Sequence, residues 1–394
     1  MVRRVGTTAR GIRAPIIKEG DDLVSIVVDC LLKAAQAENF SFHDKDVVGI
    51  TESLVARAQG NYATLEHIAL DINRKFEGDI ALLFPILSRN RFALILEGLV
   101  RSGKKIYLFL NYPSDEVGNH LMDQDKMADL GINPYLDVLS EEKYRQLFGA
   151  KVVHPFTDVD YVDLYKKIGK GQVEIYLAND PKVALNYSKE ILVANVHERQ
   201  RIKKILKKAG AVRVYSLDEI LNEPVKGSGF NPEYGLLGSN RATDEKVKLF
   251  PRDCQELVEK IQKALYGETG KMIEVMIYGD GAFKDPQGKI WELADPVVSP
   301  GFTKGLIGVP NELKLKYLAD DELYGLPDDE KSEAVKQKIM TKGDNLRGKA
   351  ESLGTTPRQL TDLLGSLCDL ISGSGDKGTP IVLVQGYFDN YATE

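Results

Sequence analysis

The sequence has few of the residues that build metal clusters, disulfide frameworks and membrane spans. Its 394 residues include three cysteines and five histidines, which form neither a C-x-x-C nor an H-x-x-x-H pair. Structural zinc sites and small disulfide-stapled folds need such closely spaced pairs, so both classes are excluded. Cys30, Cys254 and Cys368 each fall on an apolar helical stripe, which predicts that they are reduced core residues.

Long apolar runs and an excess of positive charge are also missing. No stretch is long enough to span a bilayer, and residues 1–18 lack the apolar core of a secretory signal, so we expect a cytoplasmic protein. The net charge of −6 is unlike that of a general nucleic-acid binder. The basic run at 199–204 is interpreted as a solvated helix face. Neither nucleic acid nor a membrane is expected as a partner.

What the sequence does contain is typical of a globular chain. Its length and its 43% of hydrophobic residues suffice for two or three domains with cores of their own. Asp21 or Asp22 is the expected N-cap of an amphipathic helix over residues 23–34. Residues 46–50 are expected to form a strand, and residues 51–60 a polar turn or a second strand.

The C-terminal part carries a second series of elements. An amphipathic helix is expected over 254–265, and a strand over 272–278 leads to Asp280. A carboxylate at a strand end can hold magnesium or manganese, which prefer hard oxygen ligands. It can equally bond its own backbone in a turn. A further helix over 360–371 stops at the glycine loop 373–378.

Between these parts, strands and helices alternate. A helix is expected over 198–209, and strands are expected at 105–110, 173–177, 191–194 and 212–215. Such alternation predicts a small parallel α/β unit. His120, in the loop after the first of these strands, is the only histidine that we retain as a candidate functional residue.

The glycine loop matches the pattern G-x-G-x-x-G as Gly373-Ser374-Gly375-Asp376-Lys377-Gly378. A dinucleotide-binding fingerprint follows a strand and opens a helix, whereas here a helix precedes the loop and a strand over 381–384 follows it. The glycines still allow backbone N–H groups to converge on a phosphate.

Residues 98–105 nearly match the P-loop pattern, but Lys105 stands where magnesium binding needs Ser or Thr. A helix C-cap glycine is the preferred interpretation there.

In their order along the chain, these pieces resemble the coenzyme F420-0 gamma-glutamyl ligase family. The closest segment is Pro15-Ile16-Ile17-Lys18-Glu19-Gly20-Asp21-Asp22-Leu23. The other matching segments are 46–60, 235–240, the strand into Asp280, and 373–386. The resemblance implies a mixed α/β fold, with a ligase-like core in 1–88 and 226–394 and an inserted α/β subdomain in 89–225. It also implies a homodimer.

The family joins glutamate to a carboxylate of the coenzyme precursor, and this chemistry is usually drawn through an acyl phosphate. The resemblance implies GTP (or ATP) and Mg or Mn as cofactors, with a small-molecule carboxylate acceptor and glutamate as substrates. The positions that correspond to nucleotide contacts are Ala14, Pro15, Ile16, Ile17, Arg57, Asn240, Ser372, Gly373, Ser374, Gly375 and Gly378. Asp280 corresponds to a metal-binding aspartate.

The sequence departs from the family pattern at the expected metal site. Leu237 stands where the family has its other metal-binding aspartate, and Gly281 replaces a threonine. An acidic residue of the glycine loop is replaced by Ser374. A single carboxylate is a poor magnesium site unless other groups supply oxygen ligands. Asp115 and Glu116, in the inserted unit, are conceivable replacements.

Three hypotheses follow from these residues. The first is a nucleotide-dependent amide ligase, with an acceptor that need not be the deazaflavin coenzyme. The second is a nucleotide or phosphate-ligand binding protein that kept the fold and lost catalysis; the missing metal ligand favours it. The third is a phosphate-ligand enzyme whose active site lies at the carboxyl ends of the strands in the inserted unit.

Overall fold

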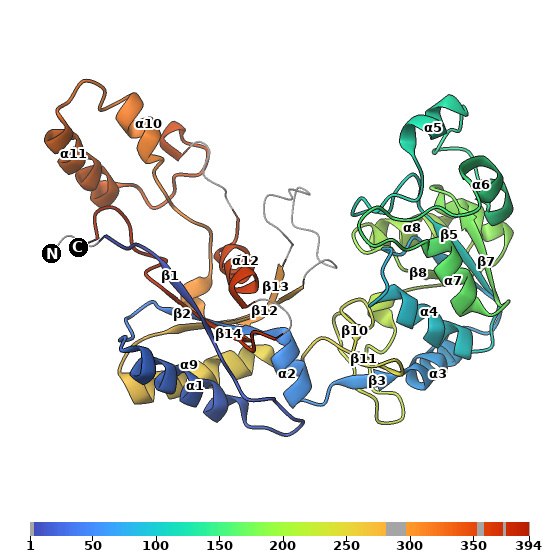
Figure 1. Cartoon of the computed structure of the whole chain (residues 1–394), viewed down its shortest axis with the longest axis horizontal. Helices are drawn as coiled ribbons and strands as arrows, with labels where there is room; N and C mark the ends of the chain where they lie inside the picture. Colours follow the sequence, from blue (N-terminus) through green and yellow to red (C-terminus); the bar gives the residue numbers. More distant parts are fainter. Residues whose placement is uncertain (1–3, 281–296, 353–357, 373–375, 394) are drawn as a thin grey trace. The chain divides into compact units, whose positions relative to one another are not determined.

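The structure is a computed structural model that describes residues 4–280, 297–352, 358–372 and 376–393 (Figure 1). The described residues of Met1–Ala58, Asp253–Gly281 and Ile290–Glu394 form one compact unit, and Gln59–Arg252 form a second. We call them the first and the second unit. The chain therefore leaves the first unit after Ala58 and returns to it at Asp253. The division expected from the sequence, with a core in 1–88 and 226–394, stays a prediction.

The first unit is built on a five-stranded sheet with the order β1-β14-β2-β12-β13. Only β2 and β12 run parallel, and the other neighbours are antiparallel. The strands are β1 (Thr8–Ile12), β2 (Val47–Thr51), β12 (Glu274–Asp280), β13 (Val297–Phe302) and β14 (Ile381–Gln385). The expected strands at 46–50 and 272–278 are thereby confirmed, and they are direct neighbours.

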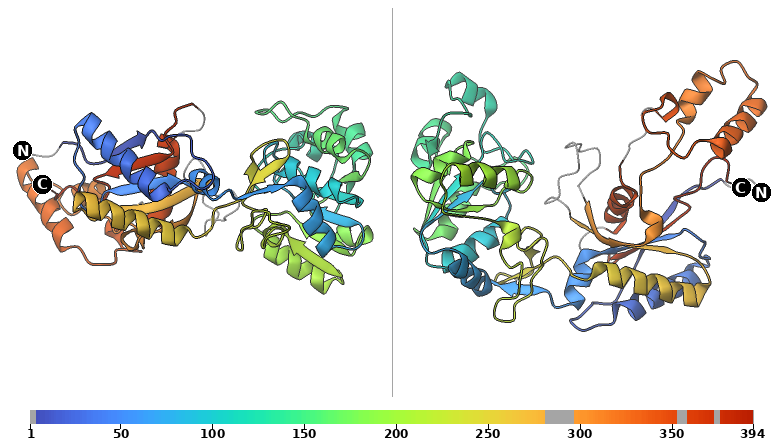
Figure 2. Two further views of the ribbon diagram at one scale, coloured as in Figure 1. Left: turned by 90° about the horizontal axis from the view of Figure 1, so that it is seen from below. Right: turned by 180° about the vertical axis from the view of Figure 1, so that it is seen from behind.

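Helices cover both faces of this sheet. The helices α1 (Leu23–Glu38) and α9 (Cys254–Thr269) lie side by side on one face (Figure 2). The helix α12 (Leu360–Ser372) covers the other face. Strand residues alternate between the two cores, as a doubly covered sheet requires. The expected cap is confirmed, because Asp22 accepts hydrogen bonds from the amides of Val24 and Ser25 at the start of α1.

One element of this unit differs from the expected one. Residues 51–60, expected as a turn or a strand, instead contain the helix α2 (Glu52–Ala58), whose apolar side chains Leu54 and Val55 pack into the core.

The cysteine prediction is confirmed, since Cys254 and Cys368 are buried, Cys30 is partly buried against the core, and all three are free thiols. Burial raises the pKa of Cys254 and of Cys368 to about 12.

A smaller helical cluster completes the first unit. It consists of α10 (Leu315–Asp320) and α11 (Asp328–Thr341), which share a core of Leu318, Leu323, Val335 and Ile339. No helix in the described ranges is long and apolar enough to cross a membrane.

The second unit is built on a six-stranded sheet with the order β6-β7-β5-β4-β8-β9. All neighbours are parallel except β6 and β7. The strands are β4 (Ile80–Leu83), β5 (Ile106–Leu110), β6 (Leu139–Ser140), β7 (Val173–Leu177), β8 (Glu190–Val193) and β9 (Arg213–Ser216). The predicted parallel α/β unit is confirmed. Its central strand β4 was not predicted, because its short run merges with the apolar residues that follow.

Helices flank this sheet, and a short three-stranded sheet accompanies it. The helices are α3 (Leu65–Lys75), α4 (Phe92–Arg101), α5 (Gln124–Asp129), α6 (Glu141–Phe148), α7 (Tyr161–Gly169) and α8 (Arg199–Lys208). The short sheet contains β3 (Tyr62–Thr64), β11 (Lys246–Lys248) and β10 (Asn240–Arg241).

The segment 98–105, whose sequence is close to that of a P-loop, contains the end of α4. Gly103 follows this helix with φ +78°, so the interpretation as a helix C-terminus is confirmed.

Candidate functional site

All five strands of the sheet in the first unit have an end at one edge. The strands β1, β2 and β12 end there at Ile12, Thr51 and Asp280, and β14 and β13 begin there at Ile381 and Val297. The register fixes this arrangement, because Ile381 is opposite both Ile12 and Ile50, and Tyr278 is opposite Thr51. The loops that leave these strands are therefore neighbours, although they are far apart in the sequence. We call this the strand-end edge.

The segment Ala14–Ile17 follows β1 at this edge and is tied to two distant parts of the chain. The amide of Ala14 donates to the carbonyl of Gly378 at 3.1 Å. The carbonyl of Ile17 accepts from Nε of Arg57, in α2, at 2.7 Å. Ile17 is buried, whereas 80% of Ile16 is exposed. Predicted nucleotide contacts from three separate stretches of sequence are thus brought together.

The described part of the glycine loop lies at the same edge. Ser372 is the last residue of α12, and its carbonyl accepts from the hydroxyl of Thr379 at 2.7 Å. Gly378 has φ +66°, a backbone conformation that favours glycine. The amide of Thr51 donates to the carbonyl of Pro380 at 3.0 Å, which attaches the loop to β2. The predicted contacts Gly373, Ser374 and Gly375 lie outside the described residues.

Four cations lie in these segments, two of them beside the exposed acids Glu19 and Asp376. Arg13, Lys18, Arg57 and Lys377 are all exposed, and all four lie in the segments that meet at the strand-end edge. Nε of Arg57 donates to the carbonyl of Ile17, and its other guanidinium nitrogens have no acceptor within the described ranges, so they suit a ligand. Exposed cations and backbone amides beside a glycine turn are suited to an anionic ligand.

Asp280, the predicted metal ligand, is the last residue of β12, so its backbone lies at this edge. Sequence reasoning missed a second acid at this edge. Glu52, the first residue of α2, is buried, and its side chain packs against Gly279: a Cβ on that glycine would meet Glu52 Cγ at 2.1 Å. The sequence signal for Glu52 would have been an acid directly after an expected strand. Within the described ranges, no cluster of three acidic, histidine or cysteine side chains is arranged to hold a metal.

Two predicted positions belong to the second unit. Asn240 is in β10 opposite Lys248, and the next amide, of Arg241, donates to the carbonyl of Asn90 at 2.8 Å. Leu237 is buried. Both residues lie in the second unit, whereas Arg57 and Asp280 lie in the first.

The candidate acids of the second unit are engaged by hydrogen-bond donors. Asp115 accepts from the amides of Leu87, Val117 and Asn119 and from the side-chain amide of Asn119. Burial raises the pKa of its carboxyl group, while these donors lower it. Glu116 accepts from the amides of Val196 and His197. Both carboxylates thus connect neighbouring loops. His120 is exposed, and its ring lies 3.3 Å from Nε2 of Gln124.

The two sheets and the helices packed on them define the chain as a mixed α/β protein. The model of the F420-0:gamma-glutamyl ligase family matches residues 11–386, and the chain belongs to this family. The resemblance noted from the sequence motifs is thereby confirmed. No curated protein matches the sequence significantly.

Proposed function

We propose that the chain is a nucleotide-dependent ligase of the gamma-glutamyl ligase type that joins the amine of glutamate to a small carboxylate acceptor through an amide bond. Membership of the gamma-glutamyl ligase family supports the ligase activity. The observation that carries the proposal is the pair of hydrogen bonds Ala14–Gly378 and Arg57–Ile17. They join three segments that match the nucleotide-contacting parts of the family. We also propose glutamate as the amine and a homodimer as the assembly, following the family.

The proposed reaction has two steps. The terminal phosphoryl group of GTP or ATP moves to an oxygen of the acceptor carboxylate, which gives an acyl phosphate and a nucleoside diphosphate. The amine of glutamate then attacks the acyl carbon, the C–N bond forms, and phosphate leaves as the amine loses a proton. Both steps need the phosphate charge neutralised and the reactants held in line. Arg57, Lys18 and Lys377 are proposed to supply charge at the strand-end edge, and the exposed side chain of Ile16 an apolar contact for the base.

Asp280 and Glu52 are proposed as the protein's oxygen ligands for magnesium or manganese. Carboxylate oxygens suit these hard cations, which usually bind one or two carboxylates together with substrate phosphates. When bound, the metal would neutralise phosphate charge. Glu52 then takes over from the aspartate that Leu237 replaces. Glu52 directly follows Thr51, which is opposite Tyr278 in the parallel strand β12, so Glu52 and Asp280 leave the sheet at the same edge, and this supports the pairing.

Calorimetry tests the nucleotide part of the proposal. GTP and ATP are titrated into the wild type with and without manganese or magnesium. We expect metal-dependent binding that weakens in Asp280→Asn and in Glu52→Gln, and that is unchanged in Asp328→Asn, an exposed acid in α11. Absence of nucleotide binding under all conditions would overturn the proposal.

A second candidate is a nucleotide-binding protein without catalysis. The buried Leu237 favours it, since that position carries a metal aspartate in the family pattern. The two functions differ in turnover. Release of phosphate that requires both glutamate and a carboxylate acceptor supports the ligase, whereas tight nucleotide binding with no phosphate release for any acceptor supports the binding protein.

A further inference from the structure

The main sheet of the second unit has a point where its strand order reverses. The chain passes from β4 to β5 on one side and from β8 to β9 on the other, and β4 and β8 are neighbours. Right-handed crossovers therefore carry α4 and α8 to opposite faces of the sheet. In open parallel sheets, small-molecule ligands bind outside the carboxyl ends of the strands at such a reversal.

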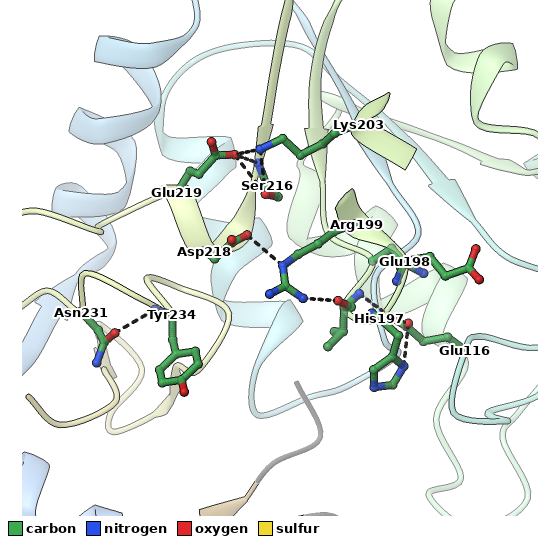
Figure 3. Close-up of polar contacts among 12 residues, drawn as sticks. Glu116, His197, Glu198, Arg199, Lys203, Ser216, Asp218, Glu219, Asn231 and Tyr234 are labelled. Atoms are coloured by element: carbon green, nitrogen blue, oxygen red, sulfur yellow. Dashed lines mark hydrogen bonds and ion pairs between the residues drawn. The ribbon is translucent and has the colours of Figure 1, made fainter. Parts of the chain in front are cut away.

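Four ionisable side chains gather at the carboxyl ends of these strands (Figure 3). Glu116 follows β5, His197 and Arg199 follow β8, and Asp218 follows β9. An oxygen of Glu116 lies 2.9 Å from Nδ1 of His197. Nε of Arg199 lies 3.2 Å from an oxygen of Asp218. We call these four residues the switch-point cluster.

The switch-point cluster is largely shielded from solvent. The side chains of His197 and Glu116 are 6% and 12% exposed, and those of Arg199 and Asp218 are 23% and 14% exposed. Buried ion pairs bring little net stability, because desolvation offsets their attraction, and apolar replacements are often neutral or stabilising. Stability alone therefore gives no reason for the Arg199–Asp218 pair at this point. A ligand that uses the charge of Arg199 does.

The contacts of Arg199 indicate the chemistry of that ligand. Besides its pairing with Asp218, it donates one hydrogen bond, from Nη1 to the carbonyl of Val196. Its second terminal nitrogen has no protein acceptor among the described residues, and the same holds for the amides of Arg199, Gln200 and Arg201 at the start of α8. Guanidinium and helix-start amides together are suited to a phosphate or a carboxylate.

The strand beside β8 shows a backbone feature at the same point. Phe84, directly after β4, has φ +59°, which is unusual for a bulky residue. It is buried, and its amide is held by the carbonyl of Phe109 at 2.9 Å. Backbone conformations of this kind gather at ligand sites, where the surrounding structure compensates their cost.

We propose that the second unit binds the oxyanion group of a small metabolite at the carboxyl ends of β4 and β8, with Arg199 as the charged contact. Glu116 and His197 hold the β8–α8 loop in the conformation that presents Arg199. This site is independent of the proposed nucleotide site in the first unit, which uses none of these residues.

The test is calorimetric titration of the whole chain with two probes, inorganic pyrophosphate and succinate. The variant Arg199→Gln/Asp218→Asn removes both charges and keeps the size and polarity of the side chains. Its control is Arg213→Gln/Glu190→Gln, a second arginine–carboxylate pair, at the amino ends of β8 and β9 in the same sheet. We expect the first variant to weaken binding of one probe at least about tenfold and the control to leave it unchanged.

Each outcome decides the inference. Pyrophosphate binding that is lost only in the first variant assigns a phosphate ligand, and the same pattern for succinate assigns a carboxylate. Equal loss in both variants, binding unchanged in the first variant, or no binding of either probe at millimolar concentration overturns the inference. Arg57→Gln separates the two sites: it weakens any pyrophosphate binding by the first unit and leaves the binding that depends on Arg199.

Discussion

Nε of Arg57 donates to the carbonyl oxygen of Ile17 at 2.7 Å, which joins the start of the chain to the helix after β2. Arg57 therefore has one structural contact, and its other guanidinium nitrogens have no acceptor in the part of the chain that the structure describes. The contact fixes the loop that carries Ile16, and these nitrogens are available to an anion. Substitutions that keep one of these two properties can separate them.

Replacing Arg57 by lysine should weaken nucleotide binding about tenfold while the fold is kept. Lysine retains the charge but cannot hold Ile17 and a phosphate with the same planar group. Arg57→Ala should bind more weakly still and lose about 1 kcal/mol of unfolding free energy with the hydrogen bond. Calorimetry and urea unfolding measure the two effects. Arg347→Ala, an exposed arginine in the same unit, is the control and should change neither.

Gly378, in the glycine loop, can be compared with Gly270, which follows α9 and has the same backbone conformation. Gly378 and Gly270 have almost the same φ, +66° and +65°, and an added Cβ would meet open space at both. Alanine at either position should cost about 1 kcal/mol of unfolding free energy, because the left-handed conformation is unfavourable for it. Only Gly378→Ala should also weaken nucleotide binding. Equal nucleotide affinity in both variants would contradict a nucleotide site at the strand-end edge.

Much of this architecture could be predicted from the sequence, because helix and strand periods are local. The helix capped by Asp22 and the parallel strands of the second unit are examples. The family resemblance located the segments that meet at the strand-end edge. The contact between Glu52 and Gly279 could not be predicted, since it depends on two strands pairing across more than half of the chain. The switch-point cluster needs the strand order of a whole sheet, which no local pattern gives.

Two aspartate–lysine pairs with the same spacing show what burial does to an ion pair. Asp71 pairs with Lys75 in α3, and Asp29 pairs with Lys33 in α1. Asp71 is fully buried and also accepts from the amide of Leu221 at 2.8 Å, whereas 56% of the Asp29 side chain is exposed. Asp71→Ala should lose about 3 kcal/mol of unfolding free energy, because Arg74 and Lys75 lose their buried anion and the amide of Leu221 loses its acceptor.

Asp29→Ala should lose less than about 1 kcal/mol, as expected for an exposed pair. Urea unfolding of both variants measures the difference. Similar losses would mean that the connection between Asp71 and the residues after β9 contributes nothing to the second unit.

Asp160 should make part of the stability dependent on pH. Its carboxylate pairs with Arg145 at 2.7 Å and accepts from the amides of Val152 and Asp163. Burial acts to raise the pKa of the Asp160 carboxyl, but the Arg145 hydrogen bonds and the two amides outweigh it and lower the pKa below 3.8. The folded state thus releases this proton more readily than the unfolded chain. The stabilisation is present above the unfolded pKa and is lost as the pH falls through the folded pKa.

Asp160→Asn should therefore lose about 3 kcal/mol of unfolding free energy at neutral pH, where Arg145 is left without its anion. As the pH falls through the folded-state pKa, the wild-type carboxyl becomes protonated too, so the difference between the two proteins should shrink. Urea unfolding at a series of pH values measures it. Glu174→Gln is the control, since Glu174, in β7 of the second unit, pairs with Lys105 at an exposed position. Its effect on the unfolding free energy should stay small at every pH. A difference for Asp160→Asn that does not change with pH would mean that its contribution is steric rather than ionic.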